Sequence, residues 1–283
     1  MGNGRRAIGA ATILLTLLGA TAACSQSSPS GSGGDASTNQ GGDWYRPELG
    51  ISWNWQLSEQ LDTTVDADLY DIDLFDTDAA TIAELQADGH RVLCYFSAGS
   101  LEDWRTDADQ FPPEVLGQPL AQWEGEEWLD IRAPQVLDVL ADRLDLAATK
   151  GCDGVEPDNV DGYIQPTGFD LTEQDQLTFI RWLAQQAHSR GLAVALKNVP
   201  DLVPELVDDF DLSITEQCVQ FDECAAFTPF VAQNKPVLNT EYEAHYLTDD
   251  DAHARMCDAT SDLQIVTMVL PLELDGSFRL TCP

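Results

Sequence analysis

The sequence has few basic residues. Its 283 residues include 14 Lys+Arg against 49 Asp+Glu, which gives a formal net charge of −35, and the only lysines are Lys150, Lys197 and Lys235. A protein that binds nucleic acid needs a positive field to neutralise phosphates, so nucleic acid and, equally, anionic lipid surfaces are excluded as partners. The acidic balance favours a cationic or neutral partner, a salt-rich environment, or simply a well-solvated surface.

Histidine is also scarce, and the common cofactor motifs are missing. The four histidines, His90, His188, His245 and His253, form neither a His-x-His nor a His-Glu-x-x-His pattern, which disfavours a metal-dependent hydrolase or deacetylase. The folded region contains no Gly-x-Ser-x-Gly elbow and no phosphate-cradling loop. We therefore expect no cofactor and no metal ion.

The N-terminal part of the chain has the pattern of an export signal. Arg5 and Arg6 precede the apolar run Ala7–Ala20, and small residues lead to Cys24. This pattern resembles a bacterial lipoprotein box, although Thr21 stands where the box usually has Leu, and it predicts a lipidated Cys24 as the only membrane attachment. We expect a signal peptide at 1–23, a flexible Gly/Ser-rich tether at 24–43 and a folded domain at 44–283, either lipid-anchored on the extracellular face of a bacterial membrane or secreted.

Six further cysteines follow Cys24. In an exported chain an even number of cysteines predicts disulfides, here three bridges among fifteen possible connectivities, and the spacings match no zinc pattern. Two of the cysteines are close in sequence, and two others would tie down the C-terminus. The predicted pairs are Cys218 with Cys224, Cys257 with Cys282, and Cys94 with Cys152.

The folded region alternates between strand-like and helix-like segments, which predicts an α/β fold with a parallel sheet, and eight strands predict a single (β/α)8 TIM barrel. An open doubly wound sheet is the alternative, but no Gly-x-Gly-x-x-Gly turn follows a strand. We expect a monomer. The first unit lacks an obvious helix, and residues 101–132 form a long insertion after the third strand. The predicted strands are Ile51–Gln56, Asp68–Leu74, Arg91–Ser97, Gly154–Asp158, Ala193–Asn198, Leu212–Glu216, Val237–Glu241 and Gln264–Val269. The predicted helices are Ala79–Asp88, Pro134–Thr149, Thr172–Arg190, Asp201–Asp208, Asp222–Gln233 and Asp249–Asp262.

Polar and acidic residues gather at the ends of the predicted strands, where barrel enzymes have their active sites. Glu156 and Asp158 are two residues apart and share one face of their strand, and burying both against the helix layer would be costly, so we expect them at the barrel mouth. Glu216 ends the sixth strand. Two carboxylates facing one opening are what glycoside hydrolysis needs.

Several stretches together resemble glycoside hydrolase family 114. They are Trp53-Asn54-Trp55-Gln56-Leu57, Tyr95-Phe96-Ser97-Ala98-Gly99-Ser100, Glu127-Trp128-Leu129-Asp130-Ile131-Arg132, Asp153-Gly154-Val155-Glu156-Pro157-Asp158-Asn159 and Thr215-Glu216-Gln217-Cys218. The resemblance implies a TIM-barrel hydrolase that acts endo on α-1,4-linked polygalactosamine, a cationic amino-sugar exopolysaccharide. By similarity, Asp158 is the nucleophile and Glu216 the general acid/base of a retaining mechanism, for which carboxyl groups about 5–5.5 Å apart are expected, against about 6.5–9.5 Å for inversion.

Other residues at the strand ends are candidates for binding the substrate, each with a structural alternative. The acidic ones either bind sugar amines or serve as helix caps and ion-pair partners, and the aromatic ones either stack on sugars or pack in the core. Lys197 would keep Asp158 ionised, which is nearly the same role as a structural ion pair. Asp130 and Arg132 either order the insertion as a lid or form a surface pair. The substrate-binding candidates are Trp55, Asp71, Asp73, Tyr95, Glu156, Asn159, Lys197, Glu241 and Tyr242.

A non-catalytic barrel that binds an amino-sugar polymer or a cell-wall glycan is the alternative function. Loss of either carboxylate would favour it, but Asp158 and Glu216 are both present. If the acidic mouth steers a cationic polymer, activity should fall as the ionic strength rises.

Overall fold

The computed structural model of the chain describes residues 44–282. The predicted signal peptide at 1–23, the lipidated Cys24 and the tether at 24–43 all lie outside the described residues. Within the described part, no helix is long and apolar enough to span a membrane.

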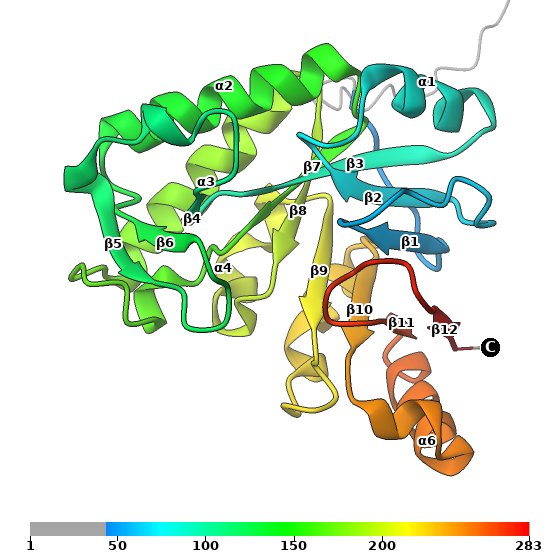
Figure 1. Ribbon diagram of the computed structural model, residues 1–283. Helices are drawn as coiled ribbons and strands as arrows, with labels where there is room; N and C mark the ends of the chain where they lie inside the picture. The colour runs from blue at the N-terminus through cyan, green and yellow to red at the C-terminus, as the bar shows by residue number, and fades with distance from the viewer. Residues whose placement is uncertain (1–43, 283) are drawn as a thin grey trace, which may run out of the picture. The chain divides into compact units, whose positions relative to one another are not determined.

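Eight parallel strands form one curled sheet, which confirms the predicted (β/α)8 barrel (Figure 1). Neighbouring strands in the sheet follow the order of the chain, and a ninth, antiparallel strand, β12 (Leu280–Thr281), pairs with β11. Each predicted strand overlaps one observed strand, with ends that differ by up to two residues. The strands are β1 Trp53–Gln56, β2 Leu69–Asp73, β3 Arg91–Ser97, β7 Gly154–Asp158, β8 Ala193–Lys197, β9 Leu212–Glu216, β10 Val237–Glu241 and β11 Val266–Val269.

The helices cover the outside of the sheet, and local sequence signals set their ends. Helix α3 begins with a capping box in which Thr172 and Asp175 exchange hydrogen bonds. Helix α2 has Pro134 in its first turn and ends at Gly151, whose φ of 88° is left-handed. No helix joins β1 to β2, as predicted, and the predicted helices at 201–208 and 222–233 are broken into short 3-10 and α segments. The α-helices are α1 Ala79–Ala87, α2 Pro134–Lys150, α3 Glu173–Ser189, α4 Val203–Leu206, α5 Thr228–Ala232 and α6 Asp250–Ser261; the 3-10 helices are η1 Ala108–Gln110, η2 Pro113–Val115, η3 Gly162–Ile164, η4 Pro200–Leu202, η5 Val207–Asp209, η6 Cys224–Phe227 and η7 Ala244–Leu247.

The core has two main parts because side chains alternate along each strand. On β3, Val92, Cys94 and Phe96 pack toward the helices, whereas Leu93 belongs to the separate cluster inside the barrel. That inner cluster includes Trp53 and other residues that point to the barrel axis. The same alternation sends every second residue at a strand end toward the mouth, where polar groups replace the apolar filling.

The C-terminal segment closes the gap between the first and last parallel strands. Among the described residues no backbone ladder joins β11 to β1; instead the segment after β11 runs beside β1 (Figure 1). Leu274 O accepts hydrogen bonds from the backbone N–H groups of Leu57 and Ser58, and the Arg279 guanidinium donates to Trp53 O at 2.8 Å. This segment therefore supports the strand that carries Trp55.

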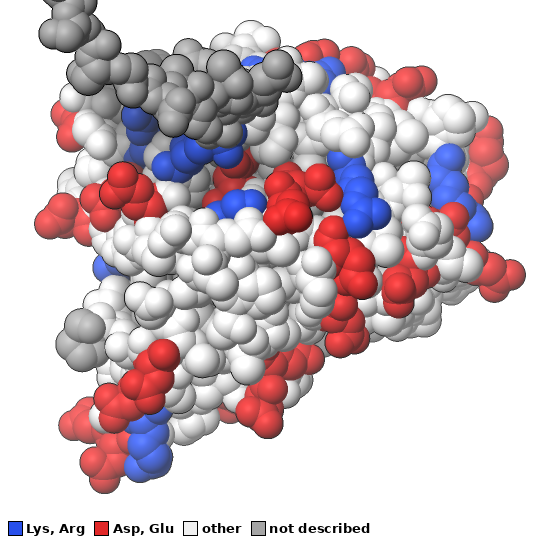
Figure 2. Space-filling model, turned by 180° about the vertical axis from the view of Figure 1, so that it is seen from behind, with Lys and Arg blue, Asp and Glu red and all other residues white. Residues whose placement is uncertain are grey.

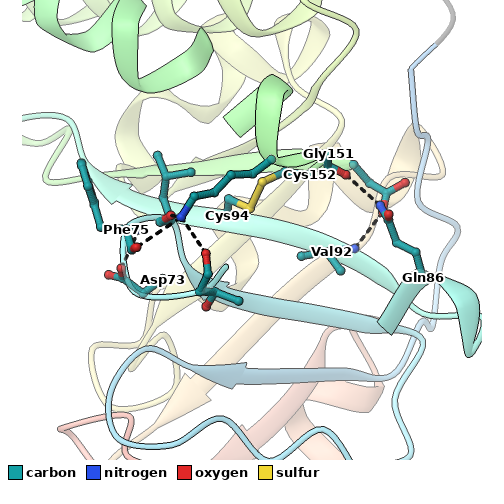
Figure 3. The surroundings of a disulfide bond; sticks show 11 residues. Asp73, Phe75, Gln86, Val92, Cys94, Gly151 and Cys152 are labelled. Carbon is teal, nitrogen blue, oxygen red and sulfur yellow. Dashed lines mark hydrogen bonds between the residues drawn. A yellow bond between two sulfur atoms is a disulfide. The ribbon is translucent and has the colours of Figure 1, made fainter. Parts of the chain in front are cut away.

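All three predicted disulfides are confirmed: Cys94–Cys152, Cys218–Cys224 and Cys257–Cys282. The first ties β3 to the turn that follows α2 (Figure 3). Two hydrogen-bonding side chains flank this bridge: Gln86 donates to Gly151 O at 2.8 Å, and the Lys150 ammonium donates to three backbone carbonyls of the β2–α1 loop. The loop that follows β2 at the barrel mouth is thereby fixed to α2.

The insertion after the third strand folds into a small antiparallel sheet of its own, in the order β4-β6-β5. Its strands are β4 Ser100–Glu102, β5 Leu116–Pro119 and β6 Glu126–Leu129. Leu129 N donates to Gly99 O at 2.9 Å, so this sheet continues directly from the end of β3. The insertion therefore lies beside the mouth of the barrel.

Candidate active site

A pocket of about 420 Å³ opens at the carboxyl ends of the parallel strands. The strand ends, the insertion, the loop after β1 and the C-terminal segment at 272–274 all contribute to its lining. We call the strand-end residues Trp55, Tyr95, Asp158, Lys197 and Glu216 the barrel wall, and the residues Glu102, Trp104, Arg105, Trp123 and Glu126 from the insertion the insertion wall.

Lys197 is the centre of the barrel wall. Its ammonium is 2% exposed and lies 3.0 Å from Asp158 Oδ1, 3.2 Å from Glu216 Oε2 and 3.3 Å from Glu156 Oε1, above the ring of Trp55 at 4.9 Å. Burial by itself would lower the pKa of Lys197, but the three surrounding carboxylates raise it well above its usual value. One permanent positive charge therefore joins carboxylates from two different strands of the pocket floor.

Glu216 is held in its ionised form by donors on three sides. Tyr242 donates its hydroxyl to Oε1 at 2.5 Å, Asn198 Nδ2 donates to Oε2 at 3.1 Å, and Lys197 completes the set. Burial opposes ionisation, but these donors together hold the pKa of Glu216 below its usual value. Asp158 accepts from Tyr95 OH at 3.2 Å and is also partly open to the pocket.

Asp71 and Glu156 form a buried acidic pair behind Lys197. Both side chains are fully buried, and neither lines the pocket. Burial raises the pKa of Asp71 to about 7, and burial together with the charge of Asp71 raises the pKa of Glu156 well above its usual value. The pair therefore holds a proton at neutral pH, which limits the negative charge that Lys197 must neutralise.

Three neighbouring strands end in a residue with a left-handed backbone. Asn159 after β7, Asn198 after β8 and Gln217 after β9 have φ values of 58°, 50° and 56°. Such conformations are costly for residues other than glycine and are found at functional sites. The turn at Asn159 also requires Gly99, because a Cβ at Gly99 would lie 1.7 Å from Asn159 O.

Arg105 organises the insertion wall. Its side chain is 6% exposed and donates to both carboxylate oxygens of Asp73, at 2.6 and 3.0 Å, and to both of Glu102, at 2.7 and 2.9 Å. This double bidentate contact ties the end of β2 to the insertion and neutralises much of the charge of both acids. Burial by itself would lower the pKa of Arg105, but the two carboxylates raise it above its usual value, so Arg105 stays charged.

The insertion also brings two exposed indoles and one buried carboxylate to the pocket. Trp104 is 52% exposed and Trp123 is 44% exposed, although both line the pocket, and Glu126 is 7% exposed. None of the five residues of the insertion wall was predicted from the sequence. Two tryptophans in a polar segment without helix or strand periodicity, directly after a barrel strand, are the signal that points to them.

The structure divides the predicted substrate-binding residues into two groups. Tyr242 lies behind the pocket and reaches it only through Glu216, and Glu241 accepts from Val219 N at 2.9 Å on the far side of β10. Asp130 and Arg132 form a half-exposed pair away from the pocket. The residues that line the pocket are Trp55, Asp73, Tyr95, Asp158, Asn159, Lys197 and Glu216; those that do not are Asp71, Glu156, Glu241 and Tyr242.

One group of described residues brings three metal-binding side chains together, namely His253, Cys257 and Cys282. Because Cys257 and Cys282 form a disulfide, their sulfurs are not thiolate ligands.

Acidic side chains are spread over the surface, and on the face seen in Figure 2 most of the few basic side chains lie beside them. The negative charge is therefore general as well as local to the pocket.

A (β/α)8 barrel with two carboxylates beside one lysine at its carboxyl end defines a glycosidase-type active site. The model of glycoside-hydrolase family GH114 matches residues 34–283, and the chain belongs to this family of glycoside hydrolases. The structure is similar to that of Ega3 from Aspergillus fumigatus, solved as a complex with galactosamine, with 39% identity, a TM-score of 0.79, and coverage of 88% of this chain and 100% of that chain.

A second solved structure shares the fold. The glycoside hydrolase domain of PelA from Pseudomonas aeruginosa is 17% identical, with a TM-score of 0.63 and coverage of 80% of this chain and 96% of that domain. A search of curated protein sequences found no significant match. Family membership makes the chain an enzyme, so the alternative of a non-catalytic binding barrel loses its support.

Proposed function

We propose that this glycoside hydrolase cleaves a cationic, α-1,4-linked galactosamine polymer from within the chain, with Asp158 as nucleophile and Glu216 as general acid/base. The observation that carries the proposal is the position of these two carboxylates on one lysine at the barrel mouth. The match to a structure that holds galactosamine supports the choice of sugar. The acidic pocket lining suits a polymer whose free amines are positively charged.

The contacts of Lys197 support a retaining mechanism. Because Asp158 Oδ1 and Glu216 Oε2 both contact its ammonium, at 3.0 and 3.2 Å, these two oxygens lie at most 6.2 Å apart. Inverting enzymes separate their carboxyl groups by about 6.5–9.5 Å to leave room for a water molecule. The shorter separation favours direct attack by Asp158 on the anomeric carbon and a covalent glycosyl-enzyme intermediate.

The ionised state of Glu216 is the one that the second step of the retaining mechanism requires. In the second step Glu216 acts as a base toward the attacking water, and its low pKa provides the required carboxylate. In the first step it must donate a proton to the leaving oxygen, so Glu216 must first take up a proton from solvent as the substrate binds and weakens the hold of Lys197. As Asp158 attacks, it gives up its negative charge, which lowers the pKa of Glu216 and helps to pass this proton to the leaving oxygen.

Two further features support endo action and export: the exposed indoles beside the pocket and the three disulfides. Trp104 and Trp123 line the pocket, are about half exposed, and would provide apolar faces for further sugar rings. Three disulfides, one of them joining distant segments of the barrel, fit an oxidising compartment outside the cytoplasm. We therefore place the enzyme in the secreted class, acting on an extracellular polymer.

Release of reducing ends from α-1,4-linked galactosamine oligosaccharides tests this function. We expect the wild type to release them and both Asp158→Asn and Glu216→Gln to reduce kcat at least about 10³-fold, because each removes a group that reacts. Asp170→Asn is the matched control, since this exposed acid follows the same strand but lies outside the pocket. An inactive wild type, or equal activity in all variants, would refute the proposal. NMR of the first product reports its anomeric configuration, and inversion would refute the assigned roles.

A further inference from the structure

Glu126 differs from the other buried acids of the pocket. Three carboxylates that line the pocket are buried, Asp73, Glu102 and Glu126. Arg105 holds the first two in bidentate contacts. Within residues 44–282, no lysine, arginine or histidine lies within ion-pair distance of Glu126. A buried carboxylate without a cation is costly for a protein unless something else compensates it.

A chain of hydrogen-bond donors ends at the carboxylate of Glu126. Ser100 donates its hydroxyl to Glu126 Oε2 at 2.6 Å, so Ser97, whose Oγ lies 2.6 Å from Ser100 Oγ, must donate to Ser100. Asn159 donates to both hydroxyls, at 2.9 and 3.1 Å. Every hydrogen bond in the chain thus points toward Glu126, an orientation that favours its ionised form. Asn159 directly follows Asp158, so the chain also links Glu126 to the reacting carboxylate.

The second oxygen of Glu126 remains available to a ligand. Oε2 takes the bond from Ser100, while no hydrogen bond to Oε1 occurs among the described residues, and Glu126 lines the pocket. The other charged groups that face it are Glu102 and Asp158, which repel its charge, and Arg105, which is already occupied by its own carboxylates. A cation that enters the pocket would relieve this repulsion, and a neutral group would not.

Resting on the proposed function, we infer that Glu126 is the residue that recognises the free amine of a bound galactosamine unit, and that it thereby selects the amine over the N-acetylated sugar. The ammonium would donate to Oε1, while Ser100 keeps Oε2 in place. Asp73 and Glu102 cannot take this role, because Arg105 neutralises them and would repel a second cation.

Burial, with the charges of Glu102 and Asp158, raises the pKa of Glu126 to about 7, against the bond from Ser100 and the charge of Arg105. Near pH 7 both the protonated and the ionised form of Glu126 are therefore populated. An ammonium that binds beside it favours the carboxylate and expels this proton. Binding of the amino sugar should accordingly release protons and tighten as the pH rises through 7, as long as the amine remains charged.

Binding to an inactive background separates this inference from the hydrolytic proposal. In Glu216→Gln protein, which keeps the charge of Asp158 near Glu126, calorimetry with an α-1,4-linked galactosamine tetrasaccharide and its N-acetylated form compares Glu126→Gln with unchanged Glu126. We expect Glu126→Gln to weaken binding of the amine form about 30-fold and to leave the N-acetylated form within about twofold. Glu124→Gln is the matched control, because this exposed acid lies two residues away and does not line the pocket; it should change neither affinity.

The same titrations in two buffers of different ionisation enthalpy count protons. Protein with Glu126 should release more protons at pH 7 than the Glu126→Gln variant. If the variant does not fold, protein with Glu126 still supplies a readout, because the amine form should release more protons than the N-acetylated form. Equal weakening of both ligands, no weakening, an equal effect of Glu124→Gln, or no difference in proton release would each overturn the inference. An inactive wild type that still binds the amine form through Glu126 would instead refute only the hydrolytic function.

Discussion

The two walls of the pocket stabilise their acidic groups in different ways. On the barrel wall, one buried lysine serves Asp158, Glu216 and Glu156, so the positive charge sits among the reacting groups. On the insertion wall, Arg105 serves Asp73 and Glu102 and leaves Glu126 without a cation. The difference indicates that the barrel wall is complete by itself, whereas the insertion wall leaves one charge for a ligand to satisfy.

Removal of the central cation should have the largest effect. Lys197→Met leaves several buried carboxylates without a counter-charge, so we expect the free energy of unfolding to fall by about 3–5 kcal/mol and hydrolysis to be lost. Chemical denaturation and the reducing-end assay measure the two effects. Arg105→Met is the comparison on the insertion wall: it should also lose stability but retain measurable activity, because Asp158 and Glu216 keep Lys197. Equal loss of activity in both variants would erase the distinction between the walls.

The uncompensated Glu126 should show its cost in the pH dependence of stability. Its pKa of about 7 lies above the unfolded value of 4.5, so the folded state binds the proton more tightly, and stability is lost as the pH rises from about 4.5 to 7. Glu126→Gln removes this loss and should stabilise the protein by up to about 3 kcal/mol at pH 8, with little change at pH 4. Denaturation at both pH values tests this sign; destabilisation at pH 8 would mean that Glu126 already has a partner.

Tyr242 offers a milder test of the barrel wall. Tyr242→Phe removes the hydroxyl that donates to Glu216 at 2.5 Å, and loss of a donor to the ionised form raises the pKa of Glu216. The alkaline limb of kcat/KM, which reports the protonated acid, should move to higher pH. A fall in kcat without any shift of the profile would show that Tyr242 only maintains the local packing.

The exposed indoles test the insertion wall on the apolar side. Trp104→Ala and Trp123→Ala should each raise KM about fivefold, since an aromatic contact is worth about 1 kcal/mol, with kcat nearly unchanged. Phe221→Ala is the control, because Phe221 is 57% exposed but does not line the pocket. If short oligosaccharides are unaffected and long ones lose affinity, the tryptophans bind sugars beyond the reacting unit; if the Phe221 variant behaves alike, they do not act as specific contacts.

Salt should have the smallest effect and should act on the exposed charges. Raising the ionic strength from 0.05 to 0.5 M is expected to increase KM for the cationic polymer about threefold and to leave kcat unchanged, because the contacts of Lys197 are buried and weakly screened. Steady-state kinetics on charged and N-acetylated polymers separate the electrostatic contribution to KM from the contribution that does not depend on charge. Indifference of KM to salt would reduce the general acidic surface to a role in solubility alone.

The predictability of the two walls follows from the range of the interactions that build them. The barrel strands and the polar residues at their ends follow from local alternation. Asp158 and Glu216 could be predicted because a parallel sheet brings its strand ends together. The burial of Asp71 and Glu156 could not be predicted, since alternation gives the face of a strand on which a residue lies but not its depth below the mouth. Glu126 and Arg105 lie in an insertion without periodicity, where neither the fold nor the direction of a side chain is coded locally.

The sequence by itself predicted the eight-stranded barrel, because the alternation of strand and helix patterns is a local property, and three disulfides, because the six cysteines after Cys24 are even in number. Strand ends, together with the resemblance to the family, pointed to Asp158 and Glu216 as the candidate carboxylates. Only the tertiary structure decided that one lysine joins carboxylates of different strands, that Asp71 and Glu156 are buried with raised pKa values, and that the insertion adds Glu126 and two indoles to the pocket. These features depend on distances and burial among segments far apart in the chain, and burial sets whether a carboxylate is a solvated charge, a proton store or a binding group.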